Sequence, residues 1–215
     1  MEEDNFNEAK EKKLGERKPL NRYGRFGAIA LCVSLLGVIL YYAFGMVIVH
    51  NLNDDPDFKP SVTQSGSSHA VSLAVALIDR EVNENSWVAN DPFFMPGYFL
   101  DNMPNYQQGI IYAVSRFVLE LTDQIGRSRG SSEVDRDLDK ASGLLKYPGT
   151  IWIFDFSTSI APTASSESQY RSAQRSLISY NQRLAKGEAK FERRADNLQG
   201  TLMRFTADLG SNSAI

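Results

Sequence analysis

The chain contains 215 residues, of which 42% are hydrophobic and 23% charged, and its formal net charge is −3. These proportions are typical of globular proteins, and so small a net charge argues against a surface that binds nucleic acid. Cys32 is the only cysteine, which excludes a disulfide within the chain and a zinc site built from several cysteines.

The N-terminal part of the chain predicts a tail followed by a membrane span. Residues 1–25 are polar and rich in both signs of charge, which is typical of a short cytoplasmic tail. Residues 26–49 then contain no charged side chain. As a helix this stretch would be about 36 Å long, enough to cross the roughly 30 Å hydrocarbon core of a bilayer. Because a helix satisfies its own backbone in lipid, we expect one transmembrane helix over residues 26–49, with the lipid bilayer as its partner.

Lysine and arginine are distributed unevenly around this stretch. Beyond it, Lys59 is the only cation before Arg80, whereas the residues that precede it include Lys10, Lys12, Lys13, Arg17, Lys18, Arg22 and Arg25. This bias predicts an N-terminus in the cytoplasm and the rest of the chain outside. A cleaved signal peptide is the first alternative, but its apolar region would be shorter and a small-residue cleavage site would follow. The reversed orientation is the second alternative.

A linker and a first helix are predicted next. Residues 50–67 contain Pro56, Pro60 and Gly66 and are typical of a linker, which leaves residues 68–215 as one helical domain. Apolar side chains at helical spacing predict a helix from about Ser68 to Asn83, with Ser67 or Ser68 as its cap. They are Val71, Val75, Ile78 and Val82.

An aromatic segment follows, and its three prolines argue against a helix. Its aromatic residues are Trp87, Phe93, Phe94, Tyr98, Phe99 and Tyr106. If they are exposed, they form a surface for a protein partner, a glycan or the membrane–water interface. If they are buried, they cap the helical bundle, and this is the interpretation that we favour. Asn90, Asp91, Asp101 and Asn102 would then form the turns that hold the segment in place.

Two helices and an extended segment come next. Helical periodicity predicts one helix from about Asn105 to Arg127 and another from about Ser132 to Lys146. The charged residues between them are interpreted as a salt-bridged turn, with an anion site as the alternative. In residues 150–168, the aromatic side chains of Trp152, Phe154 and Phe156 alternate with Ile151, Ile153 and Asp155, but no second strand is apparent in the sequence. We therefore expect an extended segment that lies over the bundle.

The last predicted helix has the clearest periodicity and covers about Ser166 to Leu209. Seven-residue spacing connects Tyr170, Leu177, Leu184, Phe191, Leu198 and Phe205. The companion seam is polar in its first half, with Gln174 and Asn181, although a coiled coil requires two apolar seams. Packing inside the chain's own domain is the favoured interpretation, and an interaction surface for a second copy is the alternative. Gly187 is a position at which the helix could bend or divide.

The sequence contains few residues for catalysis or metal binding. Its two histidines, His50 and His69, belong to no zinc motif, and no phosphate-binding loop or Ser-His-Asp set is recognisable, so neither a metal nor a cofactor is expected. Glu81 ends a predicted helix just before an aromatic segment, the setting in which lytic transglycosylases and lysozyme-like enzymes place a catalytic glutamate. The Glu-Ser pair of those enzymes is absent because Val82 follows Glu81. Glu84 is the other weak candidate, and a solvated carboxylate is the simpler interpretation of Glu81.

Two long stretches resemble a known family. They are DREVNENSWVANDPFFMPGYFLDNMPNYQQGIIYAVSRFVLELTDQIGRSRGSSEVDRDL and YRSAQRSLISYNQRLAKGEAKFERRADNLQGTLMRFTADLGSNSAI. The chain is similar here to a bacterial membrane-anchored family known only as a domain of unknown function. The resemblance implies a Gram-negative inner-membrane protein with its domain in the periplasm, and it implies no catalytic or binding residues. Members continue past the equivalent of Ile215, so a truncated or shortened form stays open.

Together these features predict an all-α protein: one transmembrane helix, then a periplasmic helical bundle that ends in a long amphipathic helix. The predicted function is that of a non-enzymatic envelope protein that assembles with itself or with another envelope protein. The alternative is a periplasmic peptidoglycan hydrolase or lyase that uses Glu81 or Glu84. Besides the seven-residue seam, Trp87, Phe93 and Phe94 are the candidate interaction surface.

Overall fold

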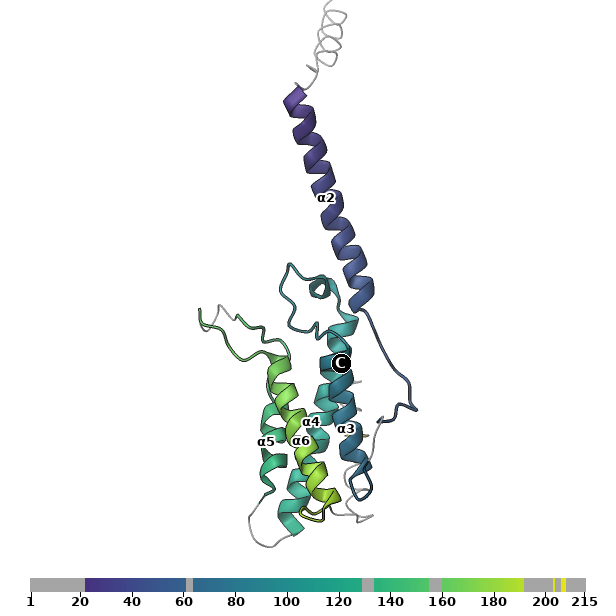
Figure 1. Cartoon of the computed structure of the whole chain (residues 1–215), viewed down its shortest axis with the longest axis vertical. Helices are drawn as coiled ribbons and strands as arrows, with labels where there is room; N and C mark the ends of the chain where they lie inside the picture. Colours follow the sequence, from purple (N-terminus) through teal and green to yellow (C-terminus); the bar gives the residue numbers. More distant parts are fainter. Residues whose placement is uncertain are drawn as a thin grey trace, which may run out of the picture. The chain divides into compact units, whose positions relative to one another are not determined.

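The computed structural model describes residues 22–60, 64–128, 134–154 and 160–191 and the single positions 203, 206 and 207. Over these residues the chain is all-helical and contains no strand, as predicted. The elements are α2 (Arg22–Val49), α3 (His69–Asp79), the π-helix η1 (Arg80–Glu84), the 3₁₀-helix η2 (Pro96–Phe99), α4 (Asn102–Ser128), α5 (Arg136–Leu145) and α6 (Ser166–Ala185) (Figure 1).

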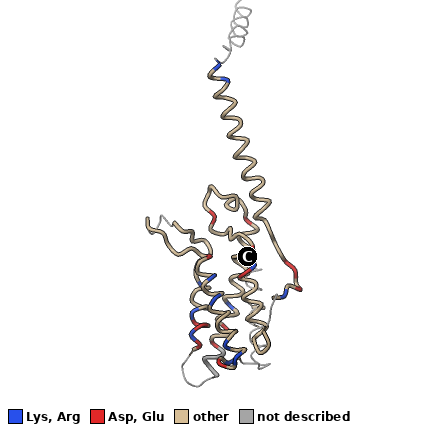
Figure 2. The backbone as a smooth tube through the Cα atoms, in the orientation of Figure 1, with Lys and Arg blue, Asp and Glu red and all other residues tan. Residues whose placement is uncertain are grey.

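α2 contains the predicted membrane span. It has 28 residues with a mean hydropathy of 2.3 over its most apolar window, and none of its residues is buried. Its cations lie at its N-terminal end (Figure 2). The helix is therefore long and apolar enough to cross a membrane. A signal sequence shares these properties, so the orientation and the inner membrane stay predictions. The chain divides into two compact units, Met1–Ala43 and Phe44–Ile215.

Helices α3 to α6 form the bundle of the second unit (Figure 1). α6 packs against α3 and α5, and α4 also packs against both of them. Each helix places an apolar stripe in the common core, as the periodicity predicted, and each fully buried aliphatic side chain contributes roughly 1.5–3 kcal/mol. The core includes Val71, Ile78, Val82, Trp87, Ile111, Val114, Val118, Leu121, Leu138, Leu145, Tyr170, Leu177 and Tyr180.

Capping side chains set the starts of the helices. Ser68 caps α3 as predicted, and its Oγ accepts a hydrogen bond from the backbone N–H of Val71. α4 begins at Asn102, three residues earlier than predicted, because Pro104 falls in its first turn, where a missing N–H costs nothing. Asp135 caps α5 by accepting from the N–H groups of Asp137 and Leu138, so the helix begins at Arg136. The predicted start at Ser132 lies outside the described residues.

The long C-terminal helix predicted from Ser166 to Leu209 is wrong over its middle, since α6 ends at Ala185. Gly187 has a φ of +74°, a left-handed conformation that side chains other than glycine rarely adopt. The N–H of Gly187 donates to the carbonyl of Leu184, and that of Glu188 donates to the carbonyl of Arg183. This pair of bonds is a Schellman motif, which ends a helix by satisfying its last carbonyls.

The segment after α5 is not helical in its described part, as predicted. The N–H of Ser166 donates to the carbonyl of Ile151, and the N–H of Thr163 donates to the carbonyl of Ile153. Residues 151–154 and 160–166 therefore form a loop that returns on itself, while residues 155–159 lie outside the described part.

Candidate functional site

Glu81 occupies the most unusual environment among the described side chains. It is 0% exposed, and its Oε1 is 2.7 Å from Nε of Arg80, which is itself buried. Its other oxygen, Oε2, is buried and has no hydrogen-bond partner among the described residues. The solvated carboxylate expected at this position is therefore wrong. Glu84, the second candidate, is exposed at the end of η1.

A π-helix positions this charge pair. η1 widens the last turn of α3, and the consecutive residues Arg80, Glu81 and Val82 are all buried. Gln107 of α4 supports the turn, because its amide N–H donates to the carbonyls of Glu81 and Ser86. Short π-helical turns are frequent at functional sites, so the position merits a chemical test.

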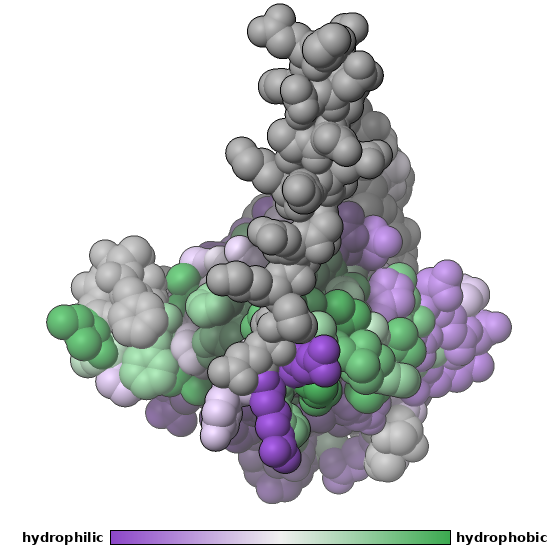
Figure 3. Space-filling view, turned by 90° about the horizontal axis from the view of Figure 1, so that it is seen from above, coloured by the Kyte–Doolittle hydropathy of each residue, from purple (hydrophilic) through white to green (hydrophobic). Residues whose placement is uncertain are grey.

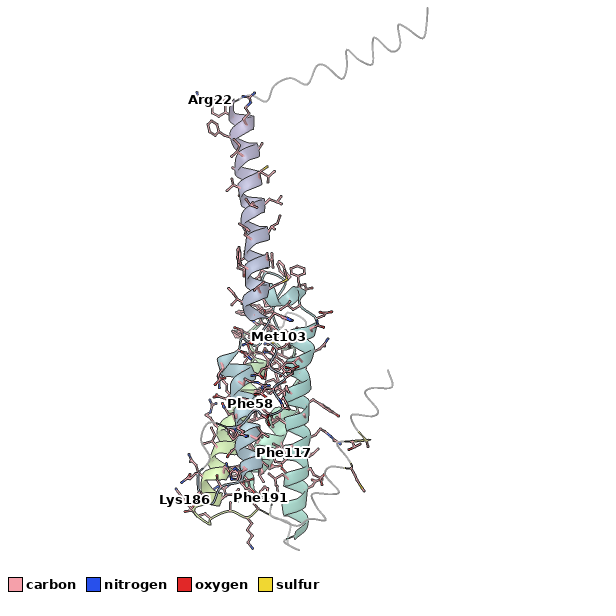
Figure 4. The ribbon with its side chains drawn as sticks, turned by 90° about the vertical axis from the view of Figure 1, so that its right-hand side faces the viewer. Arg22, Phe58, Met103, Phe117, Lys186 and Phe191 are labelled. Atoms are coloured by element: carbon pink, nitrogen blue, oxygen red, sulfur yellow. The ribbon has the colours of Figure 1, made fainter. Side chains whose placement is uncertain are left out.

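Residues of the predicted linker cover the charge pair. Nη2 of Arg80 donates to the hydroxyl of Tyr106 over 2.9 Å, and this hydroxyl donates to the carbonyl of Asn53. The guanidinium also lies 4.6 Å from the centre of the Phe58 ring, a cation–π contact. Figure 4 shows Phe58 against the bundle, at a level between Met103 and Phe117 of α4. We call Asn53, Phe58, Arg80 and Tyr106 the linker clamp.

One more contact lies closer to the end of α2. The side-chain amide of Asn51 donates to that of Asn85 over 2.8 Å, two residues after α2 ends at Val49.

Burial raises the pKa of the Tyr106 hydroxyl, while the nearby Arg80 charge lowers it, and the net shift is upward. Tyr106 therefore keeps its proton and can donate to Asn53. The first half of the predicted linker is bound to the domain and is not a free spacer.

The buried pair does not resemble the acid of a glycosidase. A general acid must come within hydrogen-bond reach of the glycosidic oxygen, and Glu81 has no exposed surface. Two cavities on the domain are not lined by it. One, of about 320 Å³, lies between α3 and α6, and the other, of about 430 Å³, lies between α4 and α5. The described residues contain no group of three or more His, Cys, Asp or Glu that could hold a metal ion.

The predicted burial of the aromatic segment is correct for Trp87 and wrong for four other residues, while Tyr106 is partly buried. Trp87 is buried, donates from Nε1 to the carbonyl of Gly149 over 2.9 Å and packs edge-to-face on Tyr170. Four neighbours in the segment are 45–68% exposed. Together with Trp152 and Phe154 of the next loop they form what we call the aromatic surface: Phe93, Phe94, Tyr98, Phe99, Trp152 and Phe154.

Edge-to-face ring contacts connect four residues of this surface across two loops, and Tyr98 and Phe99 form a further pair with ring centres 5.3 Å apart. The ring centres are 5.4 Å apart for Phe93 and Phe94, 5.7 Å for Phe94 and Trp152, and 5.6 Å for Trp152 and Phe154. Figure 3 shows hydrophobic side chains at the left-hand edge of the view from above, where residues 151–154 and 160–163 lie. The surface therefore combines rings from segments that are far apart in the sequence.

Buried polar contacts hold the backbone beneath these rings. The side-chain amide of Asn90 donates to the carbonyl of Ile151 and to the carboxylate of Glu167. Gly97 is buried against Val88 and Asp91, and a Cβ at this position would approach Asp91 within 2.2 Å. Asn90 and Asp91 are thus the turn-forming residues expected here, although the loop that they fix presents its rings outward.

The seven-residue seam is divided by the structure. Tyr170, Leu177 and Leu184 are buried in the domain core, and Phe191 packs against the core from its edge. Leu198 and Phe205 lie outside the described residues. The first part of the predicted interaction surface is therefore internal packing, and its polar companions Gln174 and Asn181 explain why. Gln174 donates to Asp79, and Asn181 accepts from the N–H of Ser68 and donates to Ser72.

The sequence analysis did not identify Arg80, Gln107 or the two linker residues of the clamp, and it named Tyr106 only as part of the aromatic segment. One signal was present, because Glu81 lies three residues after Ile78 and therefore on the apolar face of its helix. A carboxylate at such a position is either paired or functional. The other partners come from the linker and from α4, at separations that no periodicity connects.

Residues 49–214 match the family described as "Uncharacterized protein conserved in bacteria (DUF2333)". No curated protein and no solved structure matches the chain. The match begins at the last residue of α2 and covers the linker, the clamp, the aromatic surface and the whole bundle. The chain belongs to this bacterial family of uncharacterised proteins.

Proposed function

We propose that this protein is a non-enzymatic component of the cell envelope, anchored in the inner membrane by α2 with its N-terminus in the cytoplasm. Its helical domain stands in the periplasm and assembles there with a second copy or with another envelope protein. The observation that supports this function best is the linker clamp. The clamp joins linker residues that follow α2 closely to the domain, and this arrangement suits a component that assembles at the membrane.

The clamp also bears on the enzymatic alternative. Arg80, the partner of Glu81, is covered on the linker side by Phe58 and linked through Tyr106 to Asn53. The charge of Glu81 is therefore used to hold Arg80 in place under the linker. A hydrolase of the cell-wall glycan would need this carboxylate in an open cleft, so the arrangement favours a structural role.

The mass of the full chain in nanodiscs, measured across a range of protein-to-disc ratios, tests assembly. We expect a dimer or larger assembly, or a stable complex with one envelope protein. Leu198→Asp tests the outer half of the seven-residue seam: loss of mass without loss of the helical signal would assign the interface there. Leu184→Asp is the matched control, which should unfold the domain because Leu184 is a core residue.

A second assay separates binding from catalysis. The purified full chain is incubated with peptidoglycan, beside the variants Glu81→Gln and Glu84→Gln. We expect no release of soluble fragments by any of the three proteins. A reproducible activity that Glu81→Gln abolishes and Glu84→Gln retains would overturn the proposal in favour of a glycan-cleaving enzyme. A monomer without activity would overturn self-assembly and leave a hetero-complex to be shown.

A further inference from the structure

Most rings of the aromatic surface are exposed to solvent. Phe93 is 68% exposed, and Tyr98 and Phe99 are more than half exposed. The loop beneath them has already placed Trp87, Val88 and Gly97 in the interior. Because its backbone is fixed by the Asn90 contacts, the loop cannot turn these rings inward without breaking buried hydrogen bonds. A group of exposed aromatic rings of this kind marks an interaction site.

The chain itself places this surface close to the end of α2. Asn51 is bonded to Asn85, and Asn85 directly precedes the loop that carries Phe93 to Phe99. Gly45, four residues before the end of α2, also lies directly against Pro96 in the middle of this loop, because a Cβ built on Gly45 would overlap the Pro96 ring. The headgroup layer on each side of a bilayer is roughly 5–8 Å thick. If α2 spans a membrane, this end of the domain therefore meets the headgroup layer.

The chemistry of the loop suits this layer. Trp and Tyr combine an apolar ring with a polar group and are enriched at membrane–water interfaces. Residues 86–101 contain Asp91 and Asp101 but no lysine or arginine. An electrostatic contact with anionic lipid is therefore excluded for this loop, and the contact must be apolar.

We propose that the aromatic surface is immersed in the headgroup layer of the bilayer that α2 crosses, and so orients the domain on the membrane. This inference rests on the membrane anchorage in the proposed function but not on assembly with a partner. It adds a second, peripheral attachment to the anchor. Because the contact is apolar, its strength changes little between low and high salt.

Spin-label depth measurements on the full chain in nanodiscs test this contact. The native Cys32 supplies one labelling site within α2. In a Cys32→Ser background, Tyr98→Cys places a label on the aromatic surface, and Lys186→Cys places one on the exposed turn after α6, at the opposite end of the bundle from Met103 (Figure 4). Oxygen, which concentrates in lipid, and a water-soluble nickel complex serve as the two relaxation probes.

We expect the ratio of oxygen to nickel response at position 98 to lie between the high ratio of the Cys32 label, in the hydrocarbon core, and the low ratio of the label at 186, in water. Adding Phe93→Ser and Phe99→Ser should shift the position-98 label toward the nickel response. If the label entered the lipid through its own affinity, these two substitutions would leave its response unchanged. A position-98 label that matches position 186, while Cys32 is immersed, overturns the proposal. A Cys32 label that responds to nickel instead shows that the anchorage has failed.

Discussion

The Arg80–Glu81 pair determines how the end of α3 is packed. Taking two charges out of water costs several kcal/mol, and their attraction repays this cost only when both are present. Oε2 of Glu81 adds a further cost, because it is buried without a hydrogen-bond partner among the described residues. The pair is therefore weak evidence for stability but a strong constraint on which substitutions the domain tolerates.

Glu81→Leu should destabilise the domain by about 3–5 kcal/mol, because it leaves the Arg80 guanidinium buried without its counter-charge. The double variant Arg80→Met with Glu81→Leu should recover most of this loss. Urea unfolding followed by the helical signal measures both. If the double variant is as unstable as the sum of the two single variants, the residues do not act as a pair and the interpretation is wrong.

Asp91 gives the aromatic loop a dependence on pH. Burial raises its pKa from 3.8 to about 6; a hydrogen bond from the backbone of Gly97 opposes the shift, and the charge of Glu167 adds to it. The folded protein thus holds this proton more tightly than the unfolded chain. The contribution of Asp91 to stability is present below about pH 4 and is lost as the pH rises through about 6.

The variant Asp91→Asn should remove this dependence. Between pH 4 and 6, ionisation of Asp91 should lower the free energy of unfolding of the wild type by about 1 kcal/mol. The effect is this small because solvent screens the half-buried side chain. Thermal unfolding over this pH range measures it, and Asp101→Asn, an exposed carboxylate of the same loop, is the control. A pH profile of Asp91→Asn identical to that of the wild type would contradict the assignment.

At the scale of elements, the ends of helices α5 and α6 are connected by charge. Arg183 lies 2.7 Å from Asp135, the cap of α5, and 2.7 Å from Asp137 in its first turn. Desolvation raises the pKa of Asp135, but the hydrogen bond and charge of Arg183 outweigh it, and the net pKa is lowered. The contact therefore stabilises the fold at neutral pH and is lost as acid protonates Asp135.

Asp135→Ala should cost about 2 kcal/mol, because it removes both the helix cap and the partner of Arg183. Asp135→Asn should cost less, since asparagine is an equally good cap and only the charge is lost. Chemical denaturation of the two variants separates the cap from the ion pair. Equal losses would mean that the cap contributes nothing here.

Helical periodicity predicted the bundle helices, because the apolar face of each helix is visible as a regular spacing within a short stretch of sequence. It failed where a long-range contact or a backbone conformation decided the outcome. The seam from Tyr170 continues in register past Leu184, but the left-handed Gly187 and its two Schellman bonds end α6. Likewise, aromatic composition favoured burial, and only the fixed loop backbone shows that Trp87 turns inward while Phe93 turns outward. The candidate site depended on linker contacts that no local pattern encodes.

At the scale of the whole molecule, the linker clamp shortens the free chain between α2 and the bundle, because Asn51, Asn53 and Phe58 all contact the domain. A free linker of residues 50–67 would let the domain diffuse through a large volume. A linker that is bound through these three residues has fewer free residues, and this volume is smaller. Both the proposed assembly and the proposed lipid contact gain from this restriction, because each surface is presented at high local concentration to a partner in or near the bilayer.

Tyr106→Phe tests the clamp with the loss of a single oxygen. The hydroxyl of Tyr106 is the only atom that connects Arg80 to the carbonyl of Asn53 within the described contacts. Its removal should make opening of the linker easier by about 1.4 kcal/mol, which corresponds to roughly tenfold faster hydrogen exchange at the backbone amides of residues 51–58. Tyr112→Phe is the matched control, since Tyr112 is an exposed tyrosine of the same helix. Equal exchange in the two variants would mean that Phe58 and Asn51 hold the linker without help from the Tyr106 hydroxyl.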